Sequence, residues 1–149
     1  MNKGNLYLIP TTLGDSPTSY CLPEQIKDLI ELCDEFIVEN ERSARRFIKK
    51  IGANNNLDSL ILHELNKHTD TSEIPSYLKN IENGTNIGII SESGCPAVAD
   101  PGANVVAIAH DKNIKVIPLV GPSSIIMALM ASGFSGQNFA FNGYLPKNA

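Results

Sequence analysis

The sequence predicts an α/β domain with an open, mostly parallel sheet and helices on both faces. Short apolar runs alternate with segments of helical periodicity along the chain, as in α/β proteins. The apolar runs lack the polar alternation of half-exposed strands, which is typical of parallel strands covered on both faces. With 149 residues, 42% of them apolar, the chain is long enough for one domain with a substantial core.

Six apolar runs are predicted to form strands. The first is closed by Pro10, and Pro118 lies within the fifth. Because proline cannot donate to a ladder, Pro118 indicates an edge strand or a strand end. The predicted strands cover residues 6–9, 35–38, 60–62, 86–90, 115–120 and 139–141.

The segments between these runs have helical patterns. Apolar residues recur at helical spacing after Pro23, and a basic segment is stopped by Gly52. Another helix ends before Asn83 and Gly84. The predicted helices cover residues 26–32, 43–51, 74–81, 105–110 and 123–131.

Composition narrows the classes of partner. The formal net charge is −4, so bulk charge supplies no basic face for nucleic acid. A local basic patch remains available in residues 42–50. The three cysteines form no disulfide framework, which favours a reduced, cytoplasmic setting. We expect neither a transmembrane helix nor a signal peptide, since both need longer apolar segments.

Two loops that follow predicted strands have the composition of ligand sites. Residues 91–102 are rich in small side chains, which let a ligand approach the backbone, and we expect Asp100 to cap a helix that Pro101 begins. Residues 121–124 open another helix, whose N-terminal amides could hold a carboxylate or phosphate. The simpler interpretation, a plain connection and a Ser123 or Ser124 cap, is about equally good from the residues alone. The loop at 10–15 matches neither common nucleotide-binding motif.

Six segments carry motifs that occur in the same order in a known superfamily. They are Thr-Thr-Leu-Gly-Asp at 11–15, Glu-Asn-Glu-Arg at 39–42, His-Glu-Leu-Asn at 63–66, Ser-Glu-Ser-Gly-Cys-Pro with Ala-Asp-Pro-Gly within 91–102, Val-Gly-Pro-Ser-Ser at 120–124 and Phe-Asn-Gly-Tyr-Leu-Pro at 141–146. In these segments the chain resembles the tetrapyrrole methylase superfamily, and within it the bacterial small-subunit ribosomal RNA methyltransferases that act on a cytidine 2′-hydroxyl. Thr12 and Cys95 stand where those proteins have proline and threonine.

The resemblance implies a Rossmann-like N-terminal domain of a class III methyltransferase that uses S-adenosylmethionine. In that superfamily the cofactor lies between two α/β domains, so we expect residues 1–149 to be a fragment that lacks the second domain. Alone it would bind cofactor weakly and be inactive. Family members are usually homodimers, which makes a dimer the expectation here. The residues that match cofactor-contacting positions are Pro10, Ser93, Gly94, Cys95, Val98, Ser123 and Ser124.

A hydroxyl acceptor would benefit from a general base and a phosphate clamp. Glu39, at the end of the second predicted strand, is the candidate base, and Arg42 is the candidate clamp. Glu64, which follows the third predicted strand, is a second candidate base, and a solvated surface group is the favoured interpretation of either carboxylate. His63 and His68 are spaced one residue too far apart for a helical zinc site, so no metal is assigned.

Three alternatives to a ribosomal RNA substrate remain from the sequence. The chain could methylate a tetrapyrrole or another small molecule, since the charge is acidic and the motifs depart from the ribosomal RNA type. It could be a hydrolase with Ser93 as nucleophile, although Ser91 and Cys95 replace the glycines of a nucleophile elbow. It could also be a dimerising or binding module that keeps the fold without catalysis.

Overall fold

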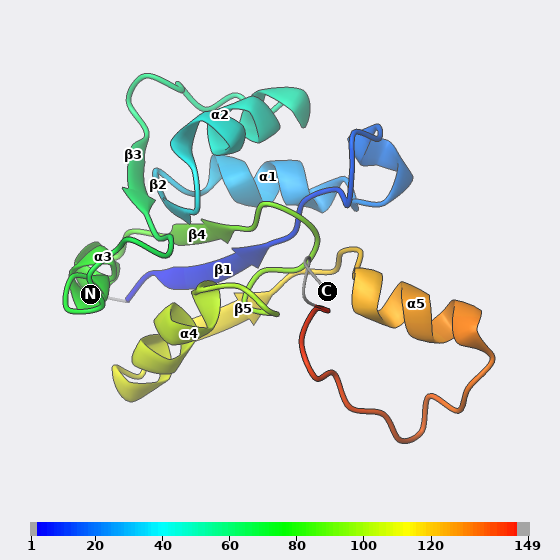
Figure 1. Cartoon of the computed structure of the whole chain (residues 1–149). Helices are drawn as coiled ribbons and strands as arrows, with labels where there is room; N and C mark the ends of the chain where they lie inside the picture. Colours follow the sequence, from blue (N-terminus) through cyan, green and yellow to red (C-terminus); the bar gives the residue numbers. More distant parts are fainter. Residues whose placement is uncertain (1–2, 146–149) are drawn as a thin grey trace.

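A computed structural model describes residues 3–145 as an α/β fold around one parallel sheet (Figure 1). The five strands lie in the order β3-β2-β4-β1-β5, and every pairing is parallel. The predicted fold class is therefore confirmed. The strands are β1 (Asn5–Ile9), β2 (Glu35–Val38), β3 (Ile61–Glu64), β4 (Ile87–Ile90) and β5 (Lys115–Pro118). The helices are α1 (Gln25–Glu31), α2 (Glu41–Lys50), α3 (Ile74–Tyr77), α4 (Gly102–Asp111) and α5 (Ser124–Ser132), with 3-10 turns at Thr18–Tyr20 and Lys79–Asn83.

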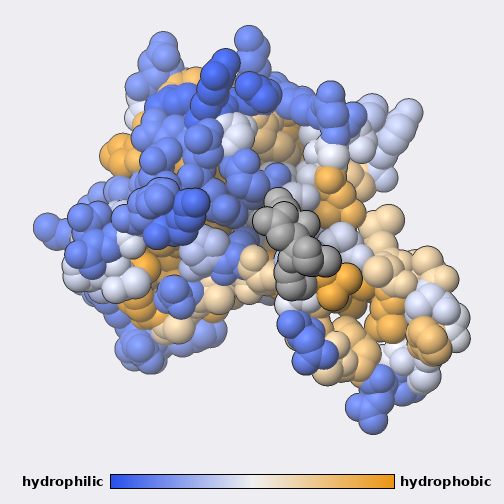
Figure 2. Space-filling view, in the orientation of Figure 1, coloured by the Kyte–Doolittle hydropathy of each residue, from blue (hydrophilic) through white to orange (hydrophobic). Residues whose placement is uncertain are grey.

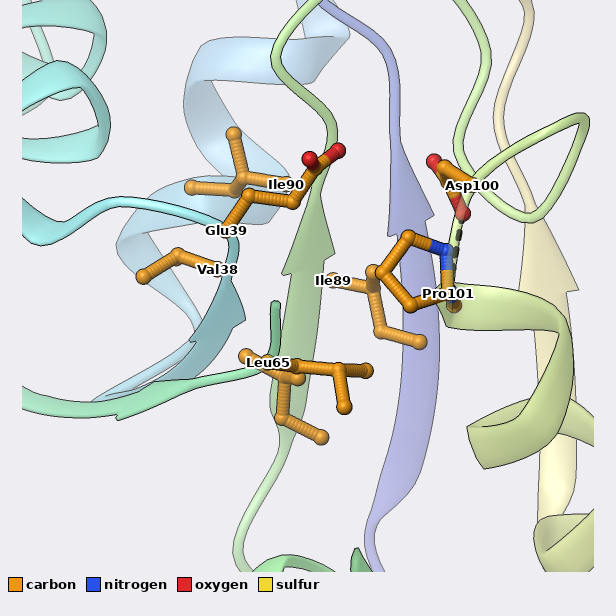
Figure 3. Close-up of a pocket in the computed structure, with 9 residues that line it drawn as sticks. Val38, Glu39, Leu65, Ile89, Ile90, Asp100 and Pro101 are labelled. Atoms are coloured by element: carbon orange, nitrogen blue, oxygen red, sulfur yellow. Dashed lines mark hydrogen bonds between the residues drawn. The ribbon is translucent and has the colours of Figure 1, made fainter. Parts of the chain in front are cut away.

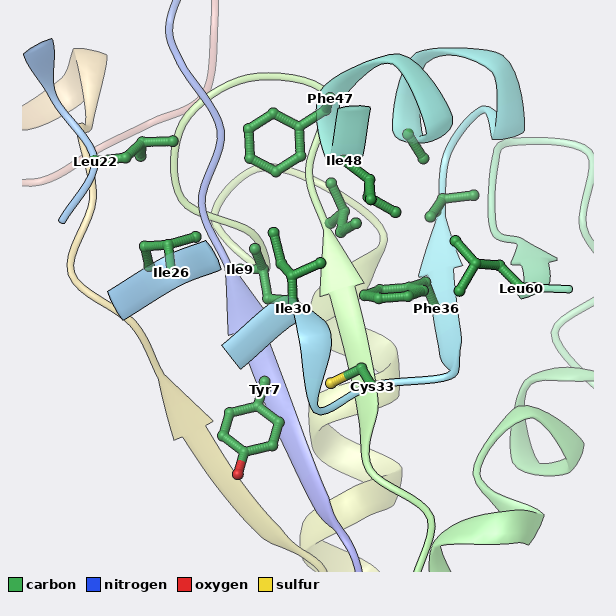
Figure 4. Close-up of a cluster of buried hydrophobic side chains, with 13 residues drawn as sticks. Tyr7, Ile9, Leu22, Ile26, Ile30, Cys33, Phe36, Phe47, Ile48 and Leu60 are labelled. Carbon is green, nitrogen blue, oxygen red and sulfur yellow. The ribbon is translucent and has the colours of Figure 1, made fainter. Parts of the chain in front are cut away.

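The sheet separates two apolar layers. In Figure 1, α1 and α2 cover one face, and α3 and α4 cover the other. Successive residues of a strand point to opposite faces, so Phe36 packs in the α1–α2 layer and Ile37 in the α3–α4 layer. Figure 4 shows Phe36 among Ile9, Ile48 and other side chains of the first layer. All residues of β2 and β4 are buried, which explains the apolar runs at 36–38 and 87–90. Glu35, the buried first residue of β2, instead accepts a hydrogen bond from the Asn80 side chain at 2.7 Å.

Gly88 in β4 shows how tightly the α1–α2 layer is packed. A Cβ atom at this position would lie 2.6 Å from Ile9 Cδ1 and 2.8 Å from Phe36 Cδ1. Real Cβ atoms do not approach so closely, so only glycine lets these two side chains meet over the centre of the sheet.

The structure corrects one predicted strand and several boundaries. Residues 139–141 form no strand, because they lie beyond α5 without a neighbouring strand to pair with. The helix predicted at 74–81 divides into α3 and a 3-10 turn, which ends where Gly84 adopts a φ of 95°. Helix α4 begins earlier than predicted, at Gly102. The expectation for Pro118 is confirmed, since it ends β5 and β5 is an edge strand.

Helix α5 differs from the other helices because none of its residues is buried. It leads into residues 133–145, all of which are exposed. In Figure 2 apolar side chains cover this protruding part of the surface. Pro146, the last residue of the motif at 141–146, lies outside the described residues. Within residues 3–145, no helix has the length and apolar content needed to cross a bilayer.

Candidate functional site

The carboxyl ends of the parallel strands lie along one edge of the sheet, and the connections that follow β2 and β4 diverge there. The connection after β2 leads to α2 on one face, whereas the connection after the neighbouring β4 leads to α4 on the opposite face. Loops that diverge in this way leave a crevice, which is the usual ligand site of an open α/β sheet. The predicted loops at 91–102 and 121–124 both lie at this edge.

Glu39 and Asp100 lie on opposite sides of a small pocket between β2 and β4 (Figure 3). Leu65 and Ile89 contribute apolar walls. Burial raises the pKa of the Glu39 carboxyl, and the charges of Asp100 and Glu92 raise it further. A carboxylate with raised pKa accepts a proton more readily, so Glu39 has the surroundings of a general base.

Asp100 also holds the backbone of the loop that follows β4. Its Oδ1 accepts hydrogen bonds from the amides of Ala97 and Gly102, both at 2.8 Å. Burial raises the pKa of Asp100, while these two hydrogen bonds lower it. The prediction that Asp100 caps a helix begun by Pro101 is wrong in register, because Pro101 is itself the N-cap residue and α4 begins at Gly102. Asp100 lies one residue before the cap and still accepts a hydrogen bond from the first helical amide, that of Gly102.

The same loop contains strained backbone. Ala97 and Ala99 have φ values of 64° and 57°, in the left-handed region that alanine seldom adopts. Such residues cost about 1–3 kcal/mol each and persist where surrounding contacts determine them. Asp100, bonded on either side of this stretch, supplies such contacts. Strain of this kind is concentrated at functional sites, which agrees with a ligand role for the loop.

The structure brings the predicted cofactor residues together. Six of them line a single hollow between the β4 and β5 loops, and Tyr144 contributes from the segment after α5. The six are Ser93, Gly94, Cys95, Val98, Ser123 and Ser124. The seventh, Pro10, lies under the β5 loop, where a Cβ atom on Gly121 would come within 2.2 Å of Pro10 Cβ.

Cys95 connects the two loops of this hollow. Its thiol lies 3.3 Å from the carbonyl oxygen of Pro122, to which it donates a hydrogen bond, and 3.5 Å from that of Gly121. Burial raises the pKa of Cys95, so the group is a thiol at neutral pH and not a nucleophilic thiolate. Ser123 caps α5 by accepting a hydrogen bond from the Ile126 amide at 3.4 Å, so the simpler interpretation of Ser123 also applies.

The hollow is too shallow to enclose a small molecule. Its volume is about 20 Å³, against roughly 300–1,000 Å³ for typical small-molecule sites. The described residues therefore form a shallow surface hollow here and not an enclosed site.

Three residues that the sequence analysis did not name as site residues make hydrogen bonds next to this hollow. Thr11 donates its backbone amide to the Gly94 carbonyl at 3.0 Å, and the Ser91 hydroxyl donates to the same carbonyl. Glu92, the next residue, accepts a hydrogen bond from the Ser43 hydroxyl of α2. Their position directly after β1 and β4 is the sequence signal that could have identified them.

The remaining candidates occupy other surroundings. Arg42 is exposed on the first turn of α2, and Glu64 accepts a hydrogen bond from the Glu41 amide at 3.4 Å.

His63 lies in β3 and not in a helix, so the helical spacing argument against a zinc site does not apply to it. It lies 3.2 Å from the carboxylate of the buried Glu35 and stacks on Tyr77, which indicates a structural role. In the part of the chain that the structure describes, the side-chain hydrogen bonds of His63 go to Glu35 and not to Ser93, the nucleophile of the hydrolase alternative.

Comparison with known proteins relates this chain to methyltransferases. No protein-family model matches it. It is 28% identical over 145 residues to the protein named Ribosomal RNA small subunit methyltransferase I of Escherichia coli O157:H7, covering 97% of this chain and 48% of that protein. The proteins of the same name from Buchnera aphidicola subsp. Acyrthosiphon pisum (33% over 144 residues, 96% and 48% covered) and Synechocystis sp. (30% over 142 residues, 95% and 48% covered) are similar to the same extent.

These proteins are homologues of the chain along nearly its whole length. The chain spans about half the length of the curated relatives it matches.

Proposed function

We propose that this chain forms the cofactor-binding N-terminal domain of an S-adenosylmethionine-dependent methyltransferase that modifies a cytidine 2′-hydroxyl in small-subunit ribosomal RNA. The observation that carries the proposal is the convergence of six cofactor-position residues from the β4 and β5 loops on one hollow. The names of the homologues support methyl transfer and a small-subunit ribosomal RNA acceptor.

The two loops provide groups suited to the methionine part of the cofactor. The first amides of α5 have no acceptor within the helix, so the N-terminus at Ser123 and Ser124 suits a carboxylate. The Gly94 backbone, with a φ of 69°, brings main-chain groups close to the hollow. The cofactor supplies the electrophilic methyl group, whereas the protein's residues bind and orient it. Such alignment can lower the barrier by roughly 7–11 kcal/mol.

Glu39 takes the proton of the acceptor hydroxyl in this proposal. Its carboxyl lies at the crevice between β2 and β4, where burial and neighbouring negative charge make it more basic. General base catalysis of this kind is typically worth about 10²–10⁴-fold. Arg42, exposed one turn along the chain, is positioned to contact an acceptor phosphate from α2.

A second domain and a second copy of the chain complete the proposed enzyme. The hollow needs a facing wall, and α5 exposes apolar side chains such as Met127 and Met130 that suit contact with further polypeptide. We expect the chain of residues 1–149 to bind cofactor weakly and to be inactive alone. Calorimetry that gives micromolar binding of S-adenosylmethionine to this chain would contradict that expectation.

The function is tested by transfer of labelled methyl groups from S-adenosylmethionine, catalysed by the full-length natural protein. Small ribosomal subunits should accept the label at a cytidine 2′-oxygen, located by nuclease digestion and mass spectrometry. Precorrin-type tetrapyrroles serve as the competing acceptor. Labelling of the tetrapyrrole alone would replace the proposed acceptor, and failure of the protein to bind the cofactor would favour a module without catalysis.

A further inference from the structure

Helix α2 concentrates positive charge on an otherwise acidic chain. It carries five of the twelve lysine and arginine residues, although the net charge is −4. Arg42, Arg46, Lys49 and Lys50 are spaced to lie along one face of the helix, and all four are exposed. We call these four residues the α2 cationic stripe.

The stripe is available to an external anion. Arg45, on another face of α2, pairs with Glu41 at 3.8 Å and donates to the Leu57 carbonyl, so it is used within the fold. In the described part of the chain, Arg42, Arg46 and Lys49 have no carboxylate at ion-pair distance. Lys50 lies 2.9 Å from Asp15, but the Asp15 side chain is fully exposed. Exposed pairs of this kind are weak, so a phosphate can replace Asp15.

A polar groove runs beside the stripe at the carboxyl edge of the sheet. It has a volume of about 430 Å³ and lies between the β1 loop, α2 and the start of the β4 loop. Hydroxyl groups of Thr12 and Ser43 and the cations of Arg46 and Lys50 line it. Asp15 and Glu92 also line it, and Glu92 is bonded to Ser43. Hydroxyls beside cations suit a ribose and its phosphates, and the volume is that of a small-molecule site.

The groove is linked to the proposed cofactor hollow by hydrogen bonds to a residue that lines the hollow. Thr11 and Ser91 line the groove, and both donate hydrogen bonds to the Gly94 carbonyl at the edge of the hollow. Ile90 lines both the groove and the pocket of Glu39. The groove therefore adjoins both the Glu39 pocket and the loop that carries the proposed cofactor residues.

We propose that the α2 cationic stripe and this groove bind the sugar-phosphate backbone of a single RNA strand beside the acceptor nucleotide. Arg46 and Lys49 contact neighbouring phosphates, since residues three apart on a helix have adjacent side chains. Lys50 exchanges Asp15 for a further phosphate. The inference rests on the proposed function, because it names where the acceptor RNA lies relative to the cofactor loops.

The test is the salt dependence of RNA binding by the full-length natural protein, with purified small-subunit ribosomal RNA as the probe. Each phosphate contact on a single strand contributes about 0.7 to the slope of log affinity against log salt concentration. The variant Arg46→Gln/Lys49→Gln should therefore make this negative slope shallower by about 1.4 and weaken binding several-fold at low salt. Both side chains are exposed, so the fold is preserved, which circular dichroism checks.

The matched control removes the same charge from the opposite edge of the sheet. Lys79→Gln/Lys115→Gln changes two exposed lysines that precede β4 and begin β5. This variant should keep the slope of the unmodified protein. An unchanged slope for the stripe variant, or an equal loss in the control, would overturn the inference.

Methyl transfer measured in parallel separates this inference from the proposed function. If the unmodified protein methylates small subunits and the stripe variant does so with an unchanged KM for RNA, the binding surface is wrong while the function stands. If no methyl transfer occurs but the slope falls as expected, the function is wrong and the RNA-binding stripe stands.

Discussion

The sheet with helices α1 to α4 and the region from α5 onward both contain many apolar residues, but these residues are buried in the first region and exposed in the second. Every residue of β4 is buried, whereas none of α5 is. Beyond α5, Phe134 and Leu145 are 81% and 89% exposed. An apolar run therefore predicts a buried element only where another element is present to cover it. In the packed region that cover is α1 to α4, and for α5 we propose further polypeptide.

The largest contrast should come from truncating an aromatic side chain in each region. Phe36→Ala removes a fully buried ring from the layer between the sheet and helices α1 and α2, so it should lower the free energy of unfolding by about 3–5 kcal/mol. Urea denaturation followed by circular dichroism measures this. Phe134→Ala is the control and should change stability by less than about 0.5 kcal/mol in the 149-residue chain. Equal costs would show that the residues after α5 pack as tightly as the sheet.

Asp100 tests whether the strained loop depends on one carboxylate. Asp100→Ala leaves the amides of Ala97 and Gly102 without their acceptor, which should cost about 1.5–3 kcal/mol. Adding Ala97→Gly should recover part of this loss, because glycine adopts a positive φ without strain. In the full-length protein the KM for S-adenosylmethionine should rise more than the KM for RNA. A rise in both by the same factor would argue against a specific role in the cofactor loop.

Glycine substitutions compare the packing of the two regions directly. Gly88→Ala places a methyl group within 3 Å of Ile9 and Phe36, so it should destabilise by about 1–3 kcal/mol. Gly136→Ala is the matched change in the exposed region, where the nearest atom would be 3.7 Å away. It should leave the thermal midpoint almost unchanged. A large loss at Gly136 would mean that the exposed segment is held in a demanding conformation.

Glu39→Gln should have the smallest effect on stability and a large effect on activity. Burial and neighbouring negative charge raise the pKa of Glu39 in the folded state. Ionised Glu39 therefore lowers the free energy of unfolding at pH values above this raised pKa, and the effect disappears below the ordinary pKa of the unfolded chain. The variant should therefore be slightly more stable than the natural protein at neutral pH, and the gain should vanish as the pH falls through the ordinary carboxyl range. Methyl transfer should decrease about 10²–10⁴-fold. Full activity of the variant would remove Glu39 as the base.

The sequence by itself determined the fold class, the two strand-end loops and the approximate position of five strands. These features depend on local information: apolar periodicity, and proline and glycine at element ends. The same information predicted a sixth strand at 139–141, which the structure lacks. A short apolar run marks a segment that could form a strand, but only a neighbouring strand supplies its hydrogen bonds.

The tertiary structure alone decided which distant residues meet. The β4 and β5 loops converge so that Cys95 contacts the carbonyl oxygen of Pro122, and Glu39 faces Asp100 across a crevice between strands. His63 pairs with buried Glu35 on the neighbouring strand, a contact that the sequence alone did not indicate. Strand order and crossover direction fix these contacts, and both depend on how whole layers pack. The basic residues of α2 were visible in the sequence, but only the fold placed them beside a groove that adjoins the β4 loop.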